Sequence, residues 1–103
     1  MTKLEDQLAA LAAAGETVTY GDLARALGLR MADLTAQLEA LMDHDAAAGN
    51  PLRAALLRQR LSPDGLPAPG FFQKAAALGI PDIDPIAERQ ALFTAQRPAT
   101  SRP

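Results

Sequence analysis

The stretch Thr17–Met42, TVTYGDLARALGLRMADLTAQLEALM, carries the pattern that decides the fold class of this chain. It predicts a short β element followed by a helix that begins at about Tyr20. A tight turn at Gly28 then leads into a second helix that extends to about Asp45. Two helices packed across a short turn in this way form a helix-turn-helix.

Small and flexible residues occupy the positions where such a pair of helices needs them. Ala24 and Gly28 are four residues apart, and the apolar Leu34 follows six residues after the glycine. A small side chain at Ala24 lets the helices approach closely, and a glycine can adopt the left-handed conformation of a tight turn. Leu34 is then expected to fill the corner between the two helices.

The segment before this pair predicts another helix over Thr2–Ala14, because its leucines recur at helical spacing. Thr2 and Glu5 have the spacing of a capping box, and Gly15 is a typical residue for a helix end. The β-branched residues Thr17–Thr19 are too few for an independent strand. We expect them to pair as one rung with a strand further along the chain.

The segment after the second helix predicts a β-wing. Residues 49–51, Gly-Asn-Pro, end the helix, and residues 62–65, Ser-Pro-Asp-Gly, form a turn signal. The apolar run Leu52–Leu61 fits a helix or a strand by its pattern alone, and its position between these two signals favours a strand. Leu66–Phe72 is then expected to return as a short edge strand. Together with residues 17–19, these segments predict a small antiparallel sheet.

Two further helices are expected near the C-terminus. Pro69-Gly70 begins a helix over Phe71–Leu78, and Asp84-Pro85 gives the cap and first turn of a last helix that extends to about Ala95. The expected buried face of that last helix consists of Ile86, Ala87, Leu92 and Phe93. The fold class predicted is therefore mainly α with a small antiparallel β-wing, a winged helix-turn-helix with extra N- and C-terminal helices. We expect residues 1–96 to form one domain and the polar residues 97–103 to form a disordered tail.

Composition excludes several classes of function. The chain has no cysteine and a single histidine, His44, so thiolate metal sites and cysteine nucleophiles are absent. The sequence shows no phosphate-binding glycine loop, no nucleophile–base arrangement and no zinc-ligand spacing. We expect a non-enzymatic protein without a cofactor or a bound metal. No signal peptide and no membrane span of about 20 apolar residues is found, which suits the cytoplasm.

The motif Val18–Ala24, VTYGDLA, followed by the Gly28 turn, resembles the winged-helix domain of O6-alkylguanine-DNA alkyltransferases and alkyltransferase-like proteins. Taken together with Pro51–Phe72, it is most similar to small bacterial winged-helix proteins, a likeness that implies no established activity. The alkyltransferase resemblance implies a DNA-binding fold in which Tyr20 matches a DNA-handling tyrosine. Alkyl transfer does not carry over, because that chemistry needs a Pro-Cys-His-Arg motif. The position of the family's base-replacing arginine is held here by Leu34.

Candidate contacts to nucleic acid lie at the starts of the two helices of the predicted helix-turn-helix and in the predicted wing. They are Tyr20, Arg30, Arg53, Arg58 and Arg60. The wing arginines could bind phosphates through bidentate hydrogen bonds, or they could pair with the acidic helix beside them. Tyr20 could contact a nucleic-acid backbone, or it could pack its ring and cap a neighbouring element with its hydroxyl.

Charge argues against ordinary groove reading by the second helix. Its exposed side is expected to carry Asp33, Glu39, Asp43 and Asp45, and the chain has a net charge of −2. Carboxylates repel phosphates, so the leading hypothesis is a nucleic-acid-binding module, with DNA as the possible partner, that relies on its basic wing. The alternative is a protein-interaction or dimerisation module. It would use the acidic helix face or the C-terminal helices to bind a protein partner or a second copy of the chain.

Overall fold

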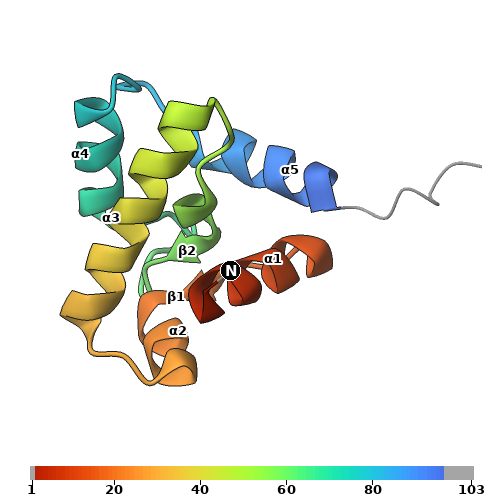
Figure 1. Ribbon diagram of the computed structural model, residues 1–103, viewed down its shortest axis with the longest axis vertical. Helices are drawn as coiled ribbons and strands as arrows, with labels where there is room; N and C mark the ends of the chain where they lie inside the picture. The colour runs from red at the N-terminus through yellow and green to blue at the C-terminus, as the bar shows by residue number, and fades with distance from the viewer. Residues whose placement is uncertain (1, 97–103) are drawn as a thin grey trace, which may run out of the picture.

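Helices dominate the structure, and a two-strand parallel sheet lies among them (Figure 1). The computed structural model describes residues 2–96, so the tail predicted over residues 97–103 lies outside the described residues. The elements in chain order are α1 (Lys3–Ala14), β1 (Val18–Thr19), α2 (Tyr20–Leu27), α3 (Met31–Ala48), the 3-10 helix η1 (Arg53–Leu56), β2 (Leu57–Arg58), α4 (Pro69–Ala77) and α5 (Pro85–Gln96).

Local signals place α1 and its ends as predicted. The Thr2 hydroxyl accepts a hydrogen bond from the Glu5 backbone N–H at 3.1 Å, and the Glu5 carboxylate accepts one from the Thr2 backbone N–H at 3.0 Å. This is the reciprocal capping box, which satisfies two donors at the exposed helix start. Gly15 ends the helix in the left-handed conformation.

The two helices on either side of the Gly28 turn are present as predicted. Gly28 has φ = 68°, and its backbone N–H donates to the last turn of α2. Leu34 is fully buried at the corner between the helices. The second helix, α3, is longer than expected, because it continues through three alanines before Gly49 ends it.

The buried stripe of α3 corrects one expectation about its charge. Leu34, Leu38 and Met42 are buried as the helical spacing predicts, whereas Met31 is 48% exposed. Asp45 was expected on the solvated acidic face, and it is buried with only 2% of its surface exposed. It lies on the same stripe as Leu38 and Met42, so it enters the interior with them.

The predicted antiparallel wing is wrong. β1 and β2 pair in parallel, with Val18 opposite Leu57 and Thr19 opposite Arg58. A parallel pair needs a long crossover between its strands, and here α2, α3 and η1 supply it. Most of the predicted strand Leu52–Leu61 is not extended, because its first part forms η1.

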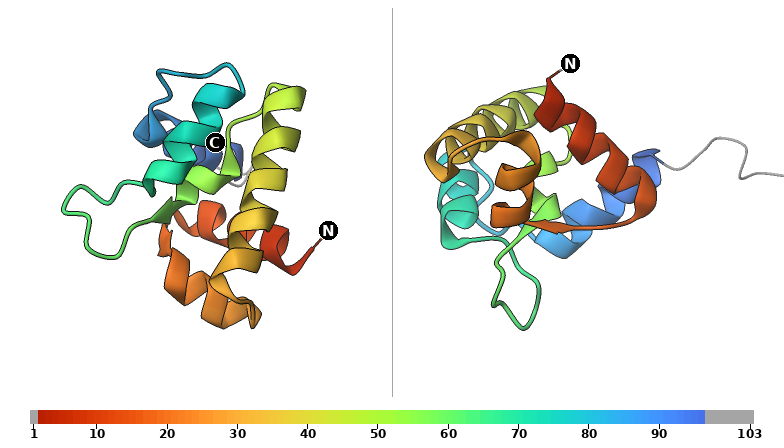
Figure 2. Two further views of the ribbon diagram at one scale, coloured as in Figure 1. Left: turned by 90° about the vertical axis from the view of Figure 1, so that its left-hand side faces the viewer. Right: turned by 90° about the horizontal axis from the view of Figure 1, so that it is seen from below.

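The predicted edge strand Leu66–Phe72 is also absent, because Pro69 begins α4 two residues earlier than the helix was expected to start. Proline at this position suits a helix start, where a missing N–H costs nothing. The Ser62–Gly65 turn does form, and the Gln59 backbone N–H donates to the Leu66 carbonyl at 2.8 Å. Residues 59–66 thus form a loop that projects from the body of the molecule (Figure 2).

The buried face of α5 differs from the predicted one. Asp84 caps the helix as expected, accepting from the Ile86 and Ala87 backbone N–H groups. Leu92 is buried and Phe93 is partly buried, but Ile86 is 47% exposed and Ala87 is exposed. The buried face instead includes Pro85 and Arg89, so the last helix is rotated relative to the prediction.

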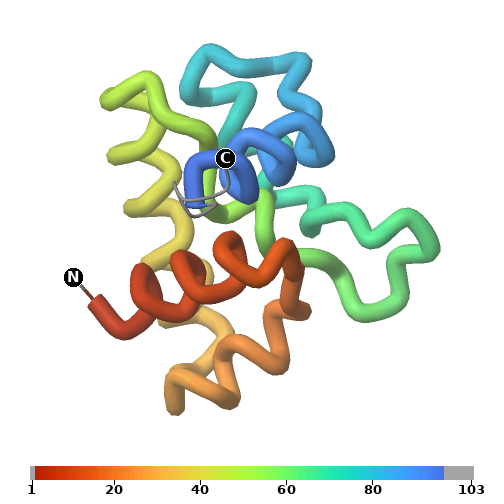
Figure 3. The backbone as a smooth tube through the Cα atoms, turned by 90° about the vertical axis from the view of Figure 1, so that its right-hand side faces the viewer, coloured from red at the N-terminus to blue at the C-terminus, as the bar shows by residue number. Residues whose placement is uncertain are grey.

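The centre of the core is the segment Leu52–Leu57, against which α1, α3 and α5 pack. Helices α1 and α5 lie together on the side of the molecule seen in Figure 3. The segment is too short to satisfy its own backbone groups, so side chains do so. Glu88 accepts from the Leu52 N–H at 2.8 Å, and Asp45 accepts from the Arg53 N–H at 3.0 Å.

Arg89 makes the largest set of these contacts. Its Nε donates to the Ala55 carbonyl at 2.6 Å, and its Nη2 donates to the carbonyls of Leu57 at 3.1 Å and Gly65 at 2.7 Å. Arg89 is only 7% exposed, and none of the ion pairs within residues 2–96 includes it. Burial lowers the pKa of the Arg89 guanidinium, although an arginine stays protonated in proteins. The cation therefore acts as a buried triple donor to the backbone.

We predict that Arg89→Met lowers the free energy of unfolding by about 2 kcal/mol or more, because it leaves three carbonyls without their donor while keeping most of the side-chain volume. Urea denaturation measures this change. Arg30→Met is the matched control, since the Arg30 side chain is 88% exposed, and it should change stability by less than about 0.5 kcal/mol. Equal effects of the two substitutions would contradict the structural role of Arg89.

Candidate functional site

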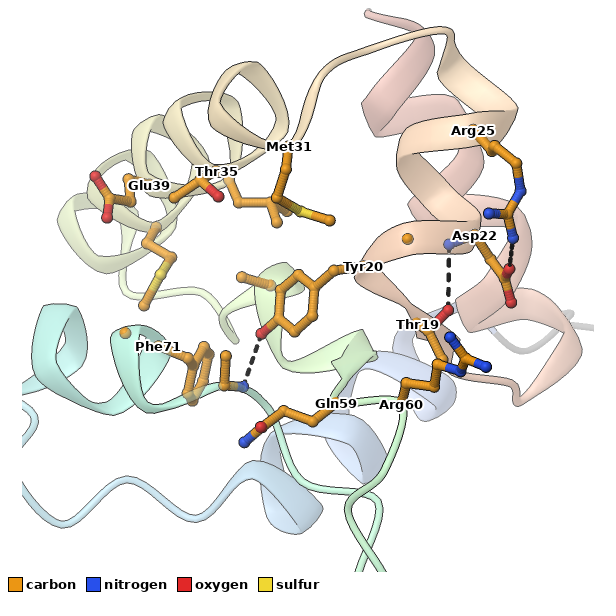
Figure 4. Close-up of a pocket in the computed structure, with 16 residues that line it drawn as sticks. Thr19, Tyr20, Asp22, Arg25, Met31, Thr35, Glu39, Gln59, Arg60 and Phe71 are labelled. Atoms are coloured by element: carbon orange, nitrogen blue, oxygen red, sulfur yellow. Dashed lines mark hydrogen bonds and ion pairs between the residues drawn. The ribbon is translucent and has the colours of Figure 1, made fainter.

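A groove of about 840 Å³ opens between α2, α3, the start of α4 and the residues that follow β2 (Figure 4). It is the larger of two hollows described on the surface of residues 2–96. The residues that line it are Thr19, Tyr20, Gly21, Asp22, Arg25, Met31, Thr35, Leu38, Glu39, Met42, Ala54, Gln59, Arg60, Ala68, Gly70 and Phe71.

The floor of the groove is apolar. Leu38, Met42 and Phe71 contribute to it while each remains at most 5% exposed, so they are held by the core beneath. Met31, at the first turn of α3, adds a half-exposed thioether at one end. The ring of Tyr20 lies in the middle of the groove in Figure 4. A flat or apolar group of a ligand could therefore pack against the ring of Tyr20 and the thioether of Met31, above a floor that the core holds in place.

Tyr20 links the groove to α4. Its hydroxyl accepts a hydrogen bond from the Ala68 backbone N–H at 2.9 Å, directly before α4 begins. Ala68 is the N-cap residue of α4, and its backbone N–H is one of the donors at a helix start that have no partner within the helix, so the tyrosine oxygen satisfies it. Burial raises the pKa of Tyr20, while the Ala68 hydrogen bond and the charge of Arg89 oppose the rise. The hydroxyl stays protonated near neutral pH, so its O–H can donate to a ligand.

One edge of the groove carries positive charge. Arg25 and Asp22, one helical turn apart on α2, form an exposed ion pair. Arg60 is exposed, and Figure 4 shows its guanidinium beside Thr19 on the same edge. The opposite edge is formed by α3 and presents Thr35 and Glu39. A ligand with a negatively charged end would bind most favourably with that end toward Arg60.

Arg53 is half-buried and does not line the groove, which corrects its prediction as a solvent-facing wing residue. Its guanidinium forms ion pairs with Asp45 at 2.8 Å and with Glu5 at 3.1 Å, joining η1 to α3 and α1. The hydrogen bonds to Asp45 raise the pKa of Arg53. The alternative prediction, that an arginine of this segment pairs with the neighbouring acidic helix, is confirmed for Arg53.

The other two candidates lie outside the lining of the groove. Arg58 is half-buried and donates from Nε to the Thr17 hydroxyl at 3.1 Å, which ties the end of β2 to the start of β1. Arg30 lies in the turn before α3 and pairs with Asp33 at 3.3 Å, with its side chain 88% exposed. Of the five predicted residues, the structure brings Tyr20 and Arg60 together at the groove.

Most of the residues that line this groove were not singled out from the sequence, and Arg25 and Phe71 show why. Arg25 stands four residues after Gly21, so a helical face of α2 lines the groove, and the spacing alone could have indicated this. Phe71 was predicted to belong to an edge strand and to a helix start at once, which left the position of its ring undefined. The proline that begins α4 is the signal that places it.

Comparisons with known proteins give no assignment, because no protein-family model, curated protein or solved structure matches the chain significantly. The winged-helix resemblance of Val18–Ala24 therefore stays a prediction. Within the described part of the chain, no group of three histidine, aspartate or glutamate side chains is arranged to hold a metal ion. None of the described helices is both long enough and apolar enough to cross a membrane.

We predict that Tyr20→Phe lowers the free energy of unfolding by about 1 kcal/mol, because the Ala68 N–H loses its acceptor while the ring is kept. Urea denaturation of the variant measures the loss. Thr35→Ala removes an exposed hydroxyl from the same groove and should change stability by less than about 0.5 kcal/mol. A Tyr20→Phe variant as stable as wild type would show that the hydroxyl does not cap α4.

The pH dependence of stability should report on Glu5. Hydrogen bonding by the Thr2 backbone N–H, followed by Arg53, lowers the pKa of Glu5 from its ordinary value of 4.5. The stabilisation is therefore present above pH 4.5 and is lost as the pH falls through the lower folded-state pKa. We predict that the stability difference between wild type and Glu5→Gln shrinks over this acidic range. The free energy of unfolding of each protein is measured by urea denaturation at several pH values. A difference between the two proteins that stays constant as the pH falls would contradict this linkage.

Proposed function

We propose that this protein is a non-enzymatic nucleic-acid-binding module that holds unpaired nucleotides in the groove between α2, α3 and α4. The observation that carries the proposal is the pairing of an apolar floor, formed by Leu38, Met42 and Phe71, with the cationic edge at Arg60. Proteins that bind single strands combine aromatic side chains, on which bases stack, with cations that follow the phosphates. Tyr20 and Phe71 are the aromatic residues of this groove. The resemblance of Val18–Ala24 and the Gly28 turn to a DNA-binding fold supports this role, although the predicted wing is absent from the described residues.

Polar groups around the floor suit the edges of bases. Thr35 and Gln59 can each donate and accept hydrogen bonds, and the Tyr20 hydroxyl retains its donor. Glu39, on the far edge, can accept from the amino group of cytosine, which is the usual base contact of a carboxylate. These groups face the groove from three different elements, so a base lying on the floor would be contacted along more than one edge.

The charges on α3 favour an unpaired strand over a duplex. Asp33 and Glu39 are exposed along the helix, and Asp43 is held by Lys74 at 2.9 Å. A helix with this acidic surface would meet phosphates on both sides if it entered the major groove of a duplex. A single strand can instead lie with its phosphates along Arg60 and its bases toward α3.

A protein-interaction role is the second candidate, and the exposure of Met31 favours it. This residue is 48% exposed beside a floor that also contains Met42, and flexible thioethers are common on surfaces that accept partner helices. Concentration-dependent self-association, measured by light scattering and lost in Met31→Lys, would support this role. A strictly monomeric protein that binds oligonucleotides would favour the nucleic-acid role.

We predict measurable binding of a single-stranded oligonucleotide at low salt, weaker binding of a matched duplex, and a loss of affinity in Arg60→Ala. Fluorescence anisotropy titrations at several salt concentrations measure all three. The slope of log K against log salt is negative, and its magnitude should decrease by about 0.7 in Arg60→Ala if Arg60 contacts one phosphate of the single strand.

Lys3→Ala is the matched control, because it removes a single exposed positive charge from α1, outside the lining of the groove. It should leave both affinity and salt slope unchanged. An affinity no better than about 10⁻⁴ M for every oligonucleotide would overturn the proposed function, because that is the weak end of non-specific association. Equal effects of the two substitutions would show that binding does not involve the groove.

A further inference from the structure

We propose that Leu61 is a wedge that inserts between neighbouring bases of the nucleic acid bound in the groove, an inference that rests on the proposed function. Leu61 is 88% exposed, far more than Met31 or Ile86, the other large apolar residues exposed within residues 2–96. It follows Arg60 directly in the loop 59–66, which projects from the body of the molecule (Figure 2). Proteins that bind the minor groove of a duplex insert leucine or another apolar side chain between base steps, and the stacked bases of an unpaired strand offer the same kind of site.

The loop is braced in a way that holds this leucine outward. At its base, the Gln59 N–H donates to the Leu66 carbonyl at 2.8 Å, and the Leu66 N–H donates to the Ser62 hydroxyl at 3.1 Å. The buried guanidinium of Arg89 binds the Gly65 carbonyl at 2.7 Å and so ties the loop to the core. The backbone of the loop that carries Leu61 is therefore held at its base before any ligand binds, which reduces the conformational entropy lost on binding.

The neighbours of Leu61 indicate the chemistry of the partner. Arg60 lines the cationic edge of the groove, and Pro63 restricts the backbone two residues beyond the leucine. An apolar side chain next to a phosphate-binding cation matches a strand in which each base is joined to a phosphate. A strand with its phosphates at Arg60 would bring the adjoining base step to Leu61, while the next base rests on the groove floor.

The experiment uses the full chain and a single-stranded DNA oligonucleotide of about 12 nucleotides, within the site sizes of single-strand binders. The oligonucleotide contains 2-aminopurine, whose fluorescence rises when it is unstacked from its neighbours, and a series places it at successive positions. We expect wild type to raise the fluorescence at one base step. In Leu61→Ala, this rise should be lost and the affinity should fall about tenfold, which is within the range for removing one stacking contact. Leu61→Phe should restore both signals.

Ile86→Ala is the matched control, since it removes an exposed apolar side chain from α5, outside the groove, and both signals should be retained. If wild type and Leu61→Ala bind the oligonucleotide and unstack the probe equally well, the wedge is wrong and the proposed function stands. If wild type binds no oligonucleotide, the proposed function fails and the wedge fails with it. If Leu61→Ala instead changes the self-association of the protein without changing oligonucleotide affinity, Leu61 contacts a second copy and the wedge is overturned.

Discussion

The hydrogen bonds that the Arg89 guanidinium donates hold together the backbone segments at the centre of the molecule. The guanidinium donates to carbonyls of η1, β2 and the projecting loop, three positions that no regular backbone ladder connects. Burying a cation is costly, and here the cost is offset by hydrogen bonds that are stronger for a charged donor in a low-dielectric interior. A neutral side chain of similar size could fill the space, but it would leave the carbonyls unpaired. The fold thus uses one long side chain where a larger sheet would use neighbouring strands.

This arrangement determines the geometry of the groove. β2 is only two residues long, and Gln59 and Arg60, which line the groove, follow it directly. Their positions relative to α2 depend on the pairing of β1 with β2, on the bond from Arg58 to Thr17, and on the contact between Arg89 and the loop. Tyr20 adds a link across the groove, since its hydroxyl holds the backbone that begins α4. The same bonds that stabilise the core therefore position the cationic edge opposite α3.

The sequence predicts the N-terminal half well because local signals control it. The capping box of α1, the Gly28 turn and the apolar stripe of α3 each depend on residues a few positions apart. The segment after Gly49 is different, because distant side chains decide its conformation. Glu88 satisfies the Leu52 backbone from 36 residues away, and Arg89 reaches Ala55 across 34 residues. No periodicity in Leu52–Leu61 could reveal these partners, so a strand was predicted where a 3-10 helix forms.

The charges of the candidate site could not be predicted from the sequence either, because distant residues decide which arginines stay exposed. By sequence, Arg53 and Arg60 belong to one basic cluster. In the structure, Arg53 forms ion pairs with Asp45 and Glu5, whereas Arg60 is exposed at the groove. Arg89 is likewise withdrawn into the interior. Asp45 and Glu5 are engaged with Arg53, so their two negative charges offset the two withdrawn arginines, and the balance of the remaining charges stays at −2. Under the proposed function, long-range electrostatic attraction would contribute little to capturing an anionic strand, so affinity would have to come from short-range contacts at the groove. Packing of bases against the groove would then be the larger contribution, and the exposed Arg60 would chiefly set the direction of the strand.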